Sequence, residues 1–400
     1  MTDGASIRRA RLAASPALFR GSFRPFFLGG ALWALVVLVL FICALSATIT
    51  LPTAFDIVGW HRHEMLFGYL GAVIAGFLLT AIPNWTGRLP IAGAPLAALA
   101  GLWLAGRIAI LCSAVVGASV AAVLDVGFLL TLAFVAGREV LAARNRNLPV
   151  VGLVLLLAIA NGLDHAEAMG APLPAGLGYR FAIGLIVMMI ALIGGRIIPS
   201  FTRNWLAKQG ASTVLPGQPT RFDMAVLAVT ALALAAWVAA PDSVASGWAL
   251  LLAGAAQAAR LARWRGLRTA REPIVLILHV AYFWIPVGLV LLGLSILTAA
   301  VQASAALHAL TAGAMAGMTL AVMTRATRGH TGRDLVAGPM TVTLYVLITL
   351  AAAIRVAAPA LPIDYLAAIH LAALAWIGAF VLFIVAYGPM LALPRTDGKL

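Results

Sequence analysis

Five of the seven histidines in the sequence lie near the ends of long apolar segments. Imidazole binds metal ions and haem iron, and it exchanges protons near neutral pH. An ionisable side chain inside a membrane is costly and usually marks a functional site. These positions therefore predict one layer of metal-ligating histidines, made of His61, His63, His165, His308 and His370.

The densest polar stretch is Trp60-His61-Arg62-His63-Glu64-Met65. Side chains two positions apart on a helix point about 200° away from each other, so we do not expect His61 and His63 to hold one metal ion. His61 and Met65 share a helix face at the i, i+4 spacing, and this pair of ligand types would suit copper. The alternative interpretation is a belt of interfacial side chains that anchors the end of the helix.

A second polar cluster, Asp164-His165-Ala166-Glu167, closes another apolar segment. A carboxylate beside an imidazole is typical of a metal site or of a proton entrance. It is equally typical of the hydrated end of a helix. The sequence leaves these three interpretations open.

Two arginines, Arg107 and Arg355, lie inside apolar segments. An arginine in lipid needs an anionic or carbonyl partner. Asp125, in a neighbouring apolar segment, and the propionates of a haem are candidate partners. The alternative is a buried ion pair or carbonyl contact with a structural role only.

The composition fixes the class of protein that must position these residues. Of the 400 residues 63% are hydrophobic and 10% are charged, and the mean hydropathy is +1.04. Soluble domains carry roughly 25% charged residues, so a soluble protein is excluded. The net charge of +14 comes from arginines in short loops between apolar segments, which argues against a nucleic-acid partner. Cys43 and Cys112 both lie in apolar segments and offer no disulfide framework.

Proline, glycine and charged residues divide the chain into apolar segments of about 20 residues, the length that crosses a bilayer. We expect an all-α, polytopic membrane bundle of twelve transmembrane helices over residues 26–390. The first segment lacks a small-residue cleavage site and is expected to be retained. Residues 1–25 and 391–400 are the expected terminal tails. The twelve predicted segments are 26–50, 61–83, 93–113, 117–136, 149–169, 179–199, 222–240, 245–263, 273–297, 303–325, 338–358 and 365–389.

The distribution of basic residues predicts the orientation. Of 27 lysines and arginines, 23 fall in the two tails and in the loops that follow even-numbered segments. Short loops rich in lysine and arginine stay in the cytoplasm. We therefore expect both termini to be cytoplasmic and the histidine layer to lie in the outer, periplasmic half of a bacterial inner membrane.

An internal repeat relates three of the segments. One offset of 245 positions aligns His63 with His308, and the same offset aligns Gly68 with Gly313. Thr86-Gly87-Arg88 then aligns with Thr331-Gly332-Arg333. With an offset of 116, Tyr179, Gly184 and Thr202 match His63, Gly68 and Thr86. The second, sixth and tenth segments are therefore interpreted as equivalent, which implies three quasi-equivalent groups of four helices.

Equivalent helices would place His63 and His308 at the same depth. Two imidazoles at one depth on different helices are what a bis-histidine haem requires, with one Nε2 atom on each face of the iron. His63 and His308 are therefore the expected ligands of a b-type haem. The remaining histidines of the layer could hold a second haem or copper.

The motifs resemble those of the NnrS family. The resemblance rests on residues 60–68 (WHRHEMLFG), 76–87 (GFLLTAIPNWTG), 195–202 (GRIIPSFT) and 23–27 (FRPFF), and on the segment from His308 to Arg333. It covers essentially all twelve predicted segments. It implies a bacterial inner-membrane protein associated with haem and copper, and linked to nitric oxide metabolism and nitrosative stress.

The repeat also gives a weaker architectural similarity to the catalytic subunits of haem–copper oxidases and nitric oxide reductases. Those subunits carry a histidine pair on the seventh helix, where this chain has none. The sixth segment presents Tyr179 instead of a histidine, and the His-x-His pattern lies on the second segment. Their binuclear centre therefore does not transfer to this chain residue by residue.

The sequence predicts a haem protein that binds, detoxifies or reduces nitric oxide, in the last case as a nitric oxide reductase-type oxidoreductase. Reduction would need protons, for which Glu64, Glu167 and Asp125 are the candidate carboxylates, and a periplasmic electron donor. In this hypothesis Arg107 and Arg355 bind the cofactor. The alternative is a transporter or delivery protein for haem or copper. No phosphate-binding glycine loop or Ser-His-Asp arrangement appears, which argues against a hydrolase or an ATP-driven transporter.

Overall fold

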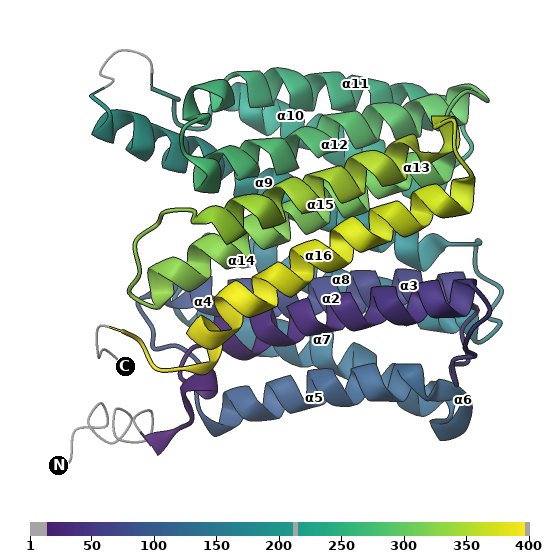
Figure 1. Ribbon diagram of the computed structural model, residues 1–400, viewed down its shortest axis with the longest axis horizontal. Helices are drawn as coiled ribbons and strands as arrows, with labels where there is room; N and C mark the ends of the chain where they lie inside the picture. Colours follow the sequence, from purple (N-terminus) through teal and green to yellow (C-terminus); the bar gives the residue numbers. More distant parts are fainter. Residues whose placement is uncertain (1–13, 211–214, 397–400) are drawn as a thin grey trace. The chain divides into compact units, whose positions relative to one another are not determined.

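The protein is all-helical, and its computed structural model describes residues 14–210 and 215–396. No strand occurs in these two stretches. Residues 1–13 and 397–400, which are parts of the two predicted terminal tails, lie outside them. Figure 1 labels the main helices, which are α2 (Phe23–Leu45), α3 (Ile57–His63), α4 (Leu70–Thr86), α5 (Ala94–Leu111), α6 (Ser113–Val116), α7 (Ala118–Ala142), α8 (Leu148–Ala168), α9 (Leu177–Lys208), α10 (Arg221–Ala239), α11 (Val244–Ala262), α12 (Pro273–Leu297), α13 (Ala303–His308), α14 (Gly317–His330), α15 (Pro339–Ala357) and α16 (Tyr365–Ala392).

Eleven helices within the described residues are long and apolar enough to cross a membrane. This makes the chain a polytopic membrane protein, with one helix fewer of that kind than the twelve predicted. The predicted segment that is missing from these eleven is the eighth, 245–263, which forms the helix α11 and has the expected length. It is less apolar because it carries Gln257 and Arg260, two polar residues that are buried within the protein.

The chain forms two compact units. Unit 1 comprises residues 1–182, 326–334 and 383–400, and unit 2 comprises residues 183–325 and 335–382. The division falls inside the helices α9, α14 and α16, so each of these contributes to both units.

In unit 1, α7 packs against α4, α5 and α8, and α2 packs against α4. Two pairs of these helices, α5 with α7 and α7 with α8, are joined by short connections, so consecutive helices run in opposite directions. The end of α5, the start of α7 and the end of α8 consequently lie at one end of the unit. The start of the α3–α4 helix contributes to the same end, as the contacts described below show.

In unit 2, α12 packs against α11, α13 and α15. Arg260, near the end of α11, is only 1% exposed. Its Nε atom lies 3.0 Å from Oδ1 of Asp223, and its Nη1 atom donates to the hydroxyl of Tyr282 at 3.1 Å. The hydroxyl of Tyr282 donates in turn to Oε1 of Gln257. Each polar side chain of this network has a partner, so the network stabilises the interior of unit 2.

Two π-helical segments interrupt the long helices directly after the aligned histidines. The first, η2, spans Glu64–Tyr69 after His63, and the second, η4, spans Ala309–Ala316 after His308. Their first residues are separated by the offset of 245 found in the sequence. π-Helical turns are rare and occur often at functional sites.

The two helices also end alike, because Gly87 and Gly332 both have the left-handed backbone that ends a helix, with φ of 68° and 74°. The third segment of the proposed repeat, in α9, is α-helical throughout. The structure thus extends the pairwise similarity of the second and tenth segments, whereas the grouping into three sets of four stays an interpretation of the sequence.

Candidate metal centre

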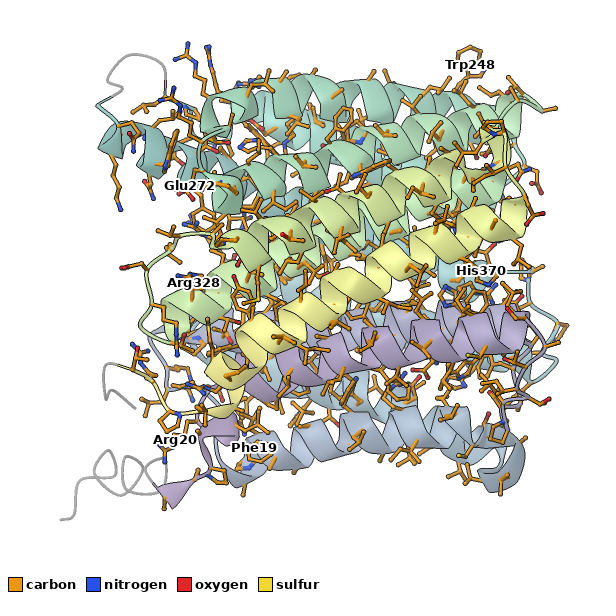
Figure 2. All side chains as sticks on the ribbon, viewed as in Figure 1. Phe19, Arg20, Trp248, Glu272, Arg328 and His370 are labelled. Carbon is orange, nitrogen blue, oxygen red and sulfur yellow. The ribbon has the colours of Figure 1, made fainter. Side chains whose placement is uncertain are left out.

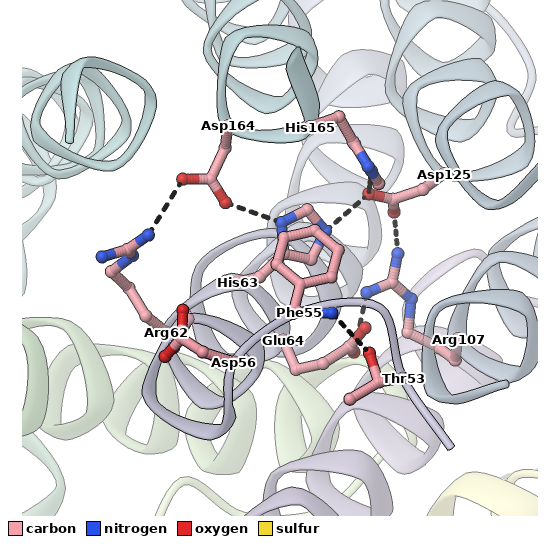
Figure 3. A network of polar contacts seen from close by, with 11 residues as sticks. Thr53, Phe55, Asp56, Arg62, His63, Glu64, Arg107, Asp125, Asp164 and His165 are labelled. Carbon is pink, nitrogen blue, oxygen red and sulfur yellow. Dashed lines mark hydrogen bonds and ion pairs between the residues drawn. The ribbon is translucent and has the colours of Figure 1, made fainter. Parts of the chain in front are cut away.

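Three buried side chains from three helices of unit 1 converge on one point. The Nε2 atom of His63 lies 2.9 Å from Oδ2 of Asp125, and Nε2 of His165 lies 3.1 Å from the same oxygen. One ligand atom from each residue lies within 4.8 Å of the others, close enough for a single metal ion (Figure 3). All three residues are at most 2% exposed.

Local structure sets the position of each ligand. Asp56 caps the start of α3, where its Oδ1 atom accepts hydrogen bonds from the amides of Val58 and Gly59. His63 ends α3, and the π-helix begins at the next residue. His165 lies in the last turn of α8, and Asp125 lies early in α7. His63 and His165 thus come from helix ends, and Asp125 comes from the first half of α7.

A second carboxylate holds the other nitrogen of His63. Nδ1 of His63 lies 2.8 Å from Oδ2 of Asp164. Metal-binding histidines usually donate their second ring N–H to a carboxylate or carbonyl, which fixes the tautomer and the ring orientation. Arg62 approaches the other oxygen of Asp164 at 3.5 Å, and its guanidinium lies over the ring of Tyr179 at 4.1 Å.

Arg107 connects the centre to Glu64. Its Nη2 atom forms an ion pair with Oδ1 of Asp125, and Nη1 donates to Oε2 of Glu64 at 2.7 Å. The indole N–H of Trp33 donates to the same oxygen of Glu64. Gly68 leaves room for these groups, because a Cβ atom at that position would lie 2.5 Å from Oε2 of Glu64.

Buried acidic groups outnumber buried basic groups at the centre. Asp125, Asp164 and Glu64 are three buried carboxyl groups, whereas Arg107 is the one fully buried guanidinium among the contacts described above. The side chain of Arg62 is 33% exposed and lies at the rim, where water screens its charge. Buried charges are paired or coordinate metals. The excess of buried carboxyl groups over guanidinium groups favours a cation at this place.

Aromatic rings fill the space around His63. Its ring centroid lies 4.9 Å from that of Phe55, 5.0 Å from that of Phe67 and 4.7 Å from that of His165. These rings surround ligand atoms that all lie within 4.8 Å of one another. The arrangement suits a single ion.

Other predicted residues of unit 1 lie elsewhere. His61 stacks on Phe41 of α2, with the ring centroids 4.0 Å apart. Oε1 of Glu167 accepts a hydrogen bond from the amide of Gly176 at 2.6 Å and thereby ties the end of α8 to the following loop. Of the predicted residues, the structure brings His63, His165, Asp125, Glu64 and Arg107 together.

The remaining predicted residues belong to unit 2. Nδ1 of His308 donates to the carbonyl of Ser304 at 2.7 Å, so Nε2 carries the lone pair of a neutral imidazole. Arg355 donates to the hydroxyl of Ser304 at 2.7 Å and lies over the ring of Tyr365. His370 is half-buried in α16.

Sequence reasoning did not assign roles to three partners of the centre, Asp164, Arg62 and Trp33. Asp164 precedes His165 directly, and its position in the polar cluster of α8 was the available signal. Trp33 lies 31 positions before Glu64 and gives no signal of its own. The pairing of Arg107 with Asp125 is among the contacts expected from the sequence, and the structure confirms it.

Comparison with known proteins gives one family. A family model described as NnrS protein matches residues 17–395, nearly the whole chain. No curated protein matches.

Proposed function

The chain belongs to the NnrS family, and we propose that it acts on nitric oxide at a metal ion held by His63, His165 and Asp125. Membership of this family makes it a membrane protein related to nitric oxide. The observation that carries the proposal further is the convergence of two imidazoles and a carboxylate in a buried space of unit 1.

The donor set indicates which metals suit the centre. Two imidazole nitrogens and one carboxylate oxygen form the ligand set of many non-haem iron sites, and imidazole also suits copper. Three protein ligands leave coordination positions for a small molecule. Iron or copper would supply an open-shell centre that binds nitric oxide there.

The surrounding residues orient the side chains that would bind the metal. Asp164 accepts the Nδ1–H of His63, which leaves the Nε2 lone pair directed at the centre. Arg107 holds the second oxygen of Asp125 and so fixes the carboxylate that faces both histidines. Glu64 is fully buried, and its Oε1 atom has no hydrogen-bond partner within the described residues. This carboxylate is our candidate for holding a proton beside the centre.

A haem fits His308 better than His63. Both ring nitrogens of His63 lie against carboxylates, and neighbouring rings occupy the space around it. The Ser304 carbonyl accepts the Nδ1–H of His308, which would leave the Nε2 lone pair of this histidine available to hold a haem. Arg355, one hydrogen bond from the same serine, would offer a cation to a propionate. A haem bound there would supply one-electron chemistry.

Metal analysis of the purified protein tests the proposal. We expect wild-type protein to retain iron or copper close to one equivalent per chain, in addition to any iron held as haem. His165→Ala and Asp125→Asn should lose this metal, whereas His61→Ala, in the same layer but outside the centre, should keep it. Nitric oxide added to the reduced wild-type protein should give a metal–nitrosyl electron paramagnetic resonance signal that the two ligand variants lack.

Two results would overturn the proposal. One is equal metal content in the wild type and both ligand variants. The other is a metal that exchanges freely across reconstituted vesicles, which would favour the alternative of a transporter or delivery protein for copper or haem.

A further inference from the structure

A basic pocket of about 190 Å³ lies in unit 1, away from the metal centre. Three arginines line it, and no aspartate or glutamate is found among its described lining residues. The polar residues of the lining are Arg20, Arg24, Arg395, Ser22, Thr80, Asn84 and His330. A pocket with these walls favours an anion.

Arg24 gives this pocket a buried guanidinium in a fixed position, which a loop with many exposed positive charges would lack. It lies in the first turn of α2 and is only 4% exposed. Its Nη1 atom donates to the carbonyls of Leu391 and Leu393, at 3.0 and 2.6 Å, and to that of Met390. All three acceptors are neutral carbonyls near the end of α16, so they fix the guanidinium without cancelling its charge.

Further arginines add to this positive charge. Arg20, Arg333 and Arg395 all lie close enough to Arg24 to repel it electrostatically. Arg395 is positioned by a hydrogen bond to the carbonyl of His330 at 2.8 Å, and Arg20 by one to the carbonyl of Ser15 at 2.8 Å. Guanidinium groups held in fixed orientations recognise phosphate oxygens through paired hydrogen bonds.

A long apolar groove of about 1270 Å³ adjoins the pocket. Its walls come from α5 and α7 and include Ala94, Ala98, Leu102 and Val135. Neighbouring residues connect the two spaces: Phe19 and Ile91 line the groove, while the adjacent Arg20 and Pro90 line the pocket. Figure 2 shows Phe19 and Arg20 beside one another at the end of the bundle where α5 begins.

We propose that unit 1 binds an anionic phospholipid at this place, with the phosphate in the basic pocket and an acyl chain in the groove. A free phosphate ion would account for the arginines but not for the groove. The pocket lies at the end of the helices where the distribution of basic residues predicts the cytoplasm, and basic pockets on that side of membrane proteins bind anionic head groups. Neither the pocket nor the groove includes a residue of the metal centre.

Native mass spectrometry of the detergent-purified protein tests this proposal. The probes are phosphatidylglycerol, phosphatidylcholine and inorganic phosphate. The variants are Arg20→Gln and Arg395→Gln in the pocket and Ala98→Phe in the groove. Arg268→Gln removes one exposed arginine from unit 2, and it serves as the matched control.

We expect one phosphatidylglycerol to bind tightly and to be preferred over phosphatidylcholine. Each pocket arginine contributes about 1 kcal/mol near a membrane surface, so each Arg→Gln change should weaken binding about fivefold. Ala98→Phe should weaken the binding of phosphatidylglycerol but leave any binding of inorganic phosphate unchanged. Arg268→Gln should change the binding of neither. All variants should elute as the wild type does in size-exclusion chromatography.

Three outcomes would overturn the lipid site. Inorganic phosphate that binds as tightly as phosphatidylglycerol would reveal a free-anion site. An unchanged affinity of Ala98→Phe for phosphatidylglycerol would show that no acyl chain lies in the groove. An equal loss in Arg268→Gln would show general attraction between a basic protein and an anionic lipid.

Discussion

The Nδ1 atom of His63 lies 2.8 Å from Oδ2 of Asp164, a residue 101 positions later in the chain. This contact joins the end of α3 to the end of α8 within the buried part of unit 1. The contact determines which ring nitrogen of His63 can bind a metal, since an N–H donated to Asp164 leaves the lone pair on Nε2. At the proposed metal centre Asp164 would therefore act through His63, as a positioning residue.

Asp164→Asn tests this relationship. An amide can accept the same hydrogen bond through its oxygen, but it lacks the charge that raises the basicity of the imidazole. We expect metal affinity to fall about 10- to 100-fold, which is the usual effect of losing such a partner. Competition with a chelator of known affinity measures the change. Glu167→Gln, in the same turn of α8, should leave the affinity unchanged because Glu167 contacts the loop amide of Gly176.

An Asp164→Asn protein with wild-type affinity would contradict the assigned role. Loss of metal accompanied by a large loss of thermal stability would indicate a structural role alone. The two effects are separated by measuring the unfolding temperature without metal, where we expect only a small difference between the variant and the wild type.

Arg107 holds two buried carboxylates, and Arg107→Met should be strongly destabilising. The change leaves Glu64 and Asp125 without their cation, and breaking a buried pair in this way costs about 3–5 kcal/mol. The double variant Arg107→Met with Glu64→Gln removes one of the two stranded charges, so we expect it to be more stable than Arg107→Met alone. Denaturant unfolding in detergent, followed by tryptophan fluorescence, provides the comparison. A double variant whose loss equals the sum of the two single losses would show that Arg107 and Glu64 are not coupled.

The fold was largely predictable because a bilayer allows few kinds of backbone structure to cross it. Backbone groups in lipid must pair within the segment, so every apolar run of about 20 residues reads as a helix. The burial of Arg260 could not be foreseen in this way. It lies near the end of the predicted segment 245–263, where a charge can be hydrated, and its partner Asp223 lies 37 positions away. A charged residue with a distant partner gives the same local pattern as a hydrated one.

The candidate site was predictable in its residue types but not in its grouping. The sequence favoured His63 and His308 as a pair because they share a helix position in the repeat. In unit 1, His63 instead meets Asp125 and His165, which lie 62 and 102 positions later on other helices. No helical periodicity connects positions so far apart, and only tertiary packing brings them together.

Gly68→Ala should disturb the ion pairs beside the metal centre. A Cβ atom at this position would lie 2.5 Å from Oε2 of Glu64, 2.6 Å from Nη1 of Arg107 and 2.9 Å from Nε1 of Trp33. Since these groups hold Asp125 in turn, we expect weaker metal binding as well as lower stability. Gly71→Ala is the matched control three residues later, where the nearest atoms lie 3.8 Å away. Equal metal affinity in both variants would mean that the Glu64–Arg107 pair does not support the centre.

Gly195→Ala tests the polar network of unit 2 by the same reasoning. A Cβ atom there would overlap with the guanidinium of Arg260, a buried group held by Asp223 and Tyr282, so the guanidinium would have to leave its partners. Forcing extra volume into a packed interior typically costs about 1–3 kcal/mol. Gly184→Ala, on the same helix, meets no atom closer than 3.7 Å and should be neutral or slightly stabilising, because alanine favours a helix by about 1 kcal/mol over glycine. Thermal unfolding of the two variants in detergent measures the difference. An unfolding temperature for Gly195→Ala equal to that of Gly184→Ala would show that Arg260 is free to move and that the network is not rigid.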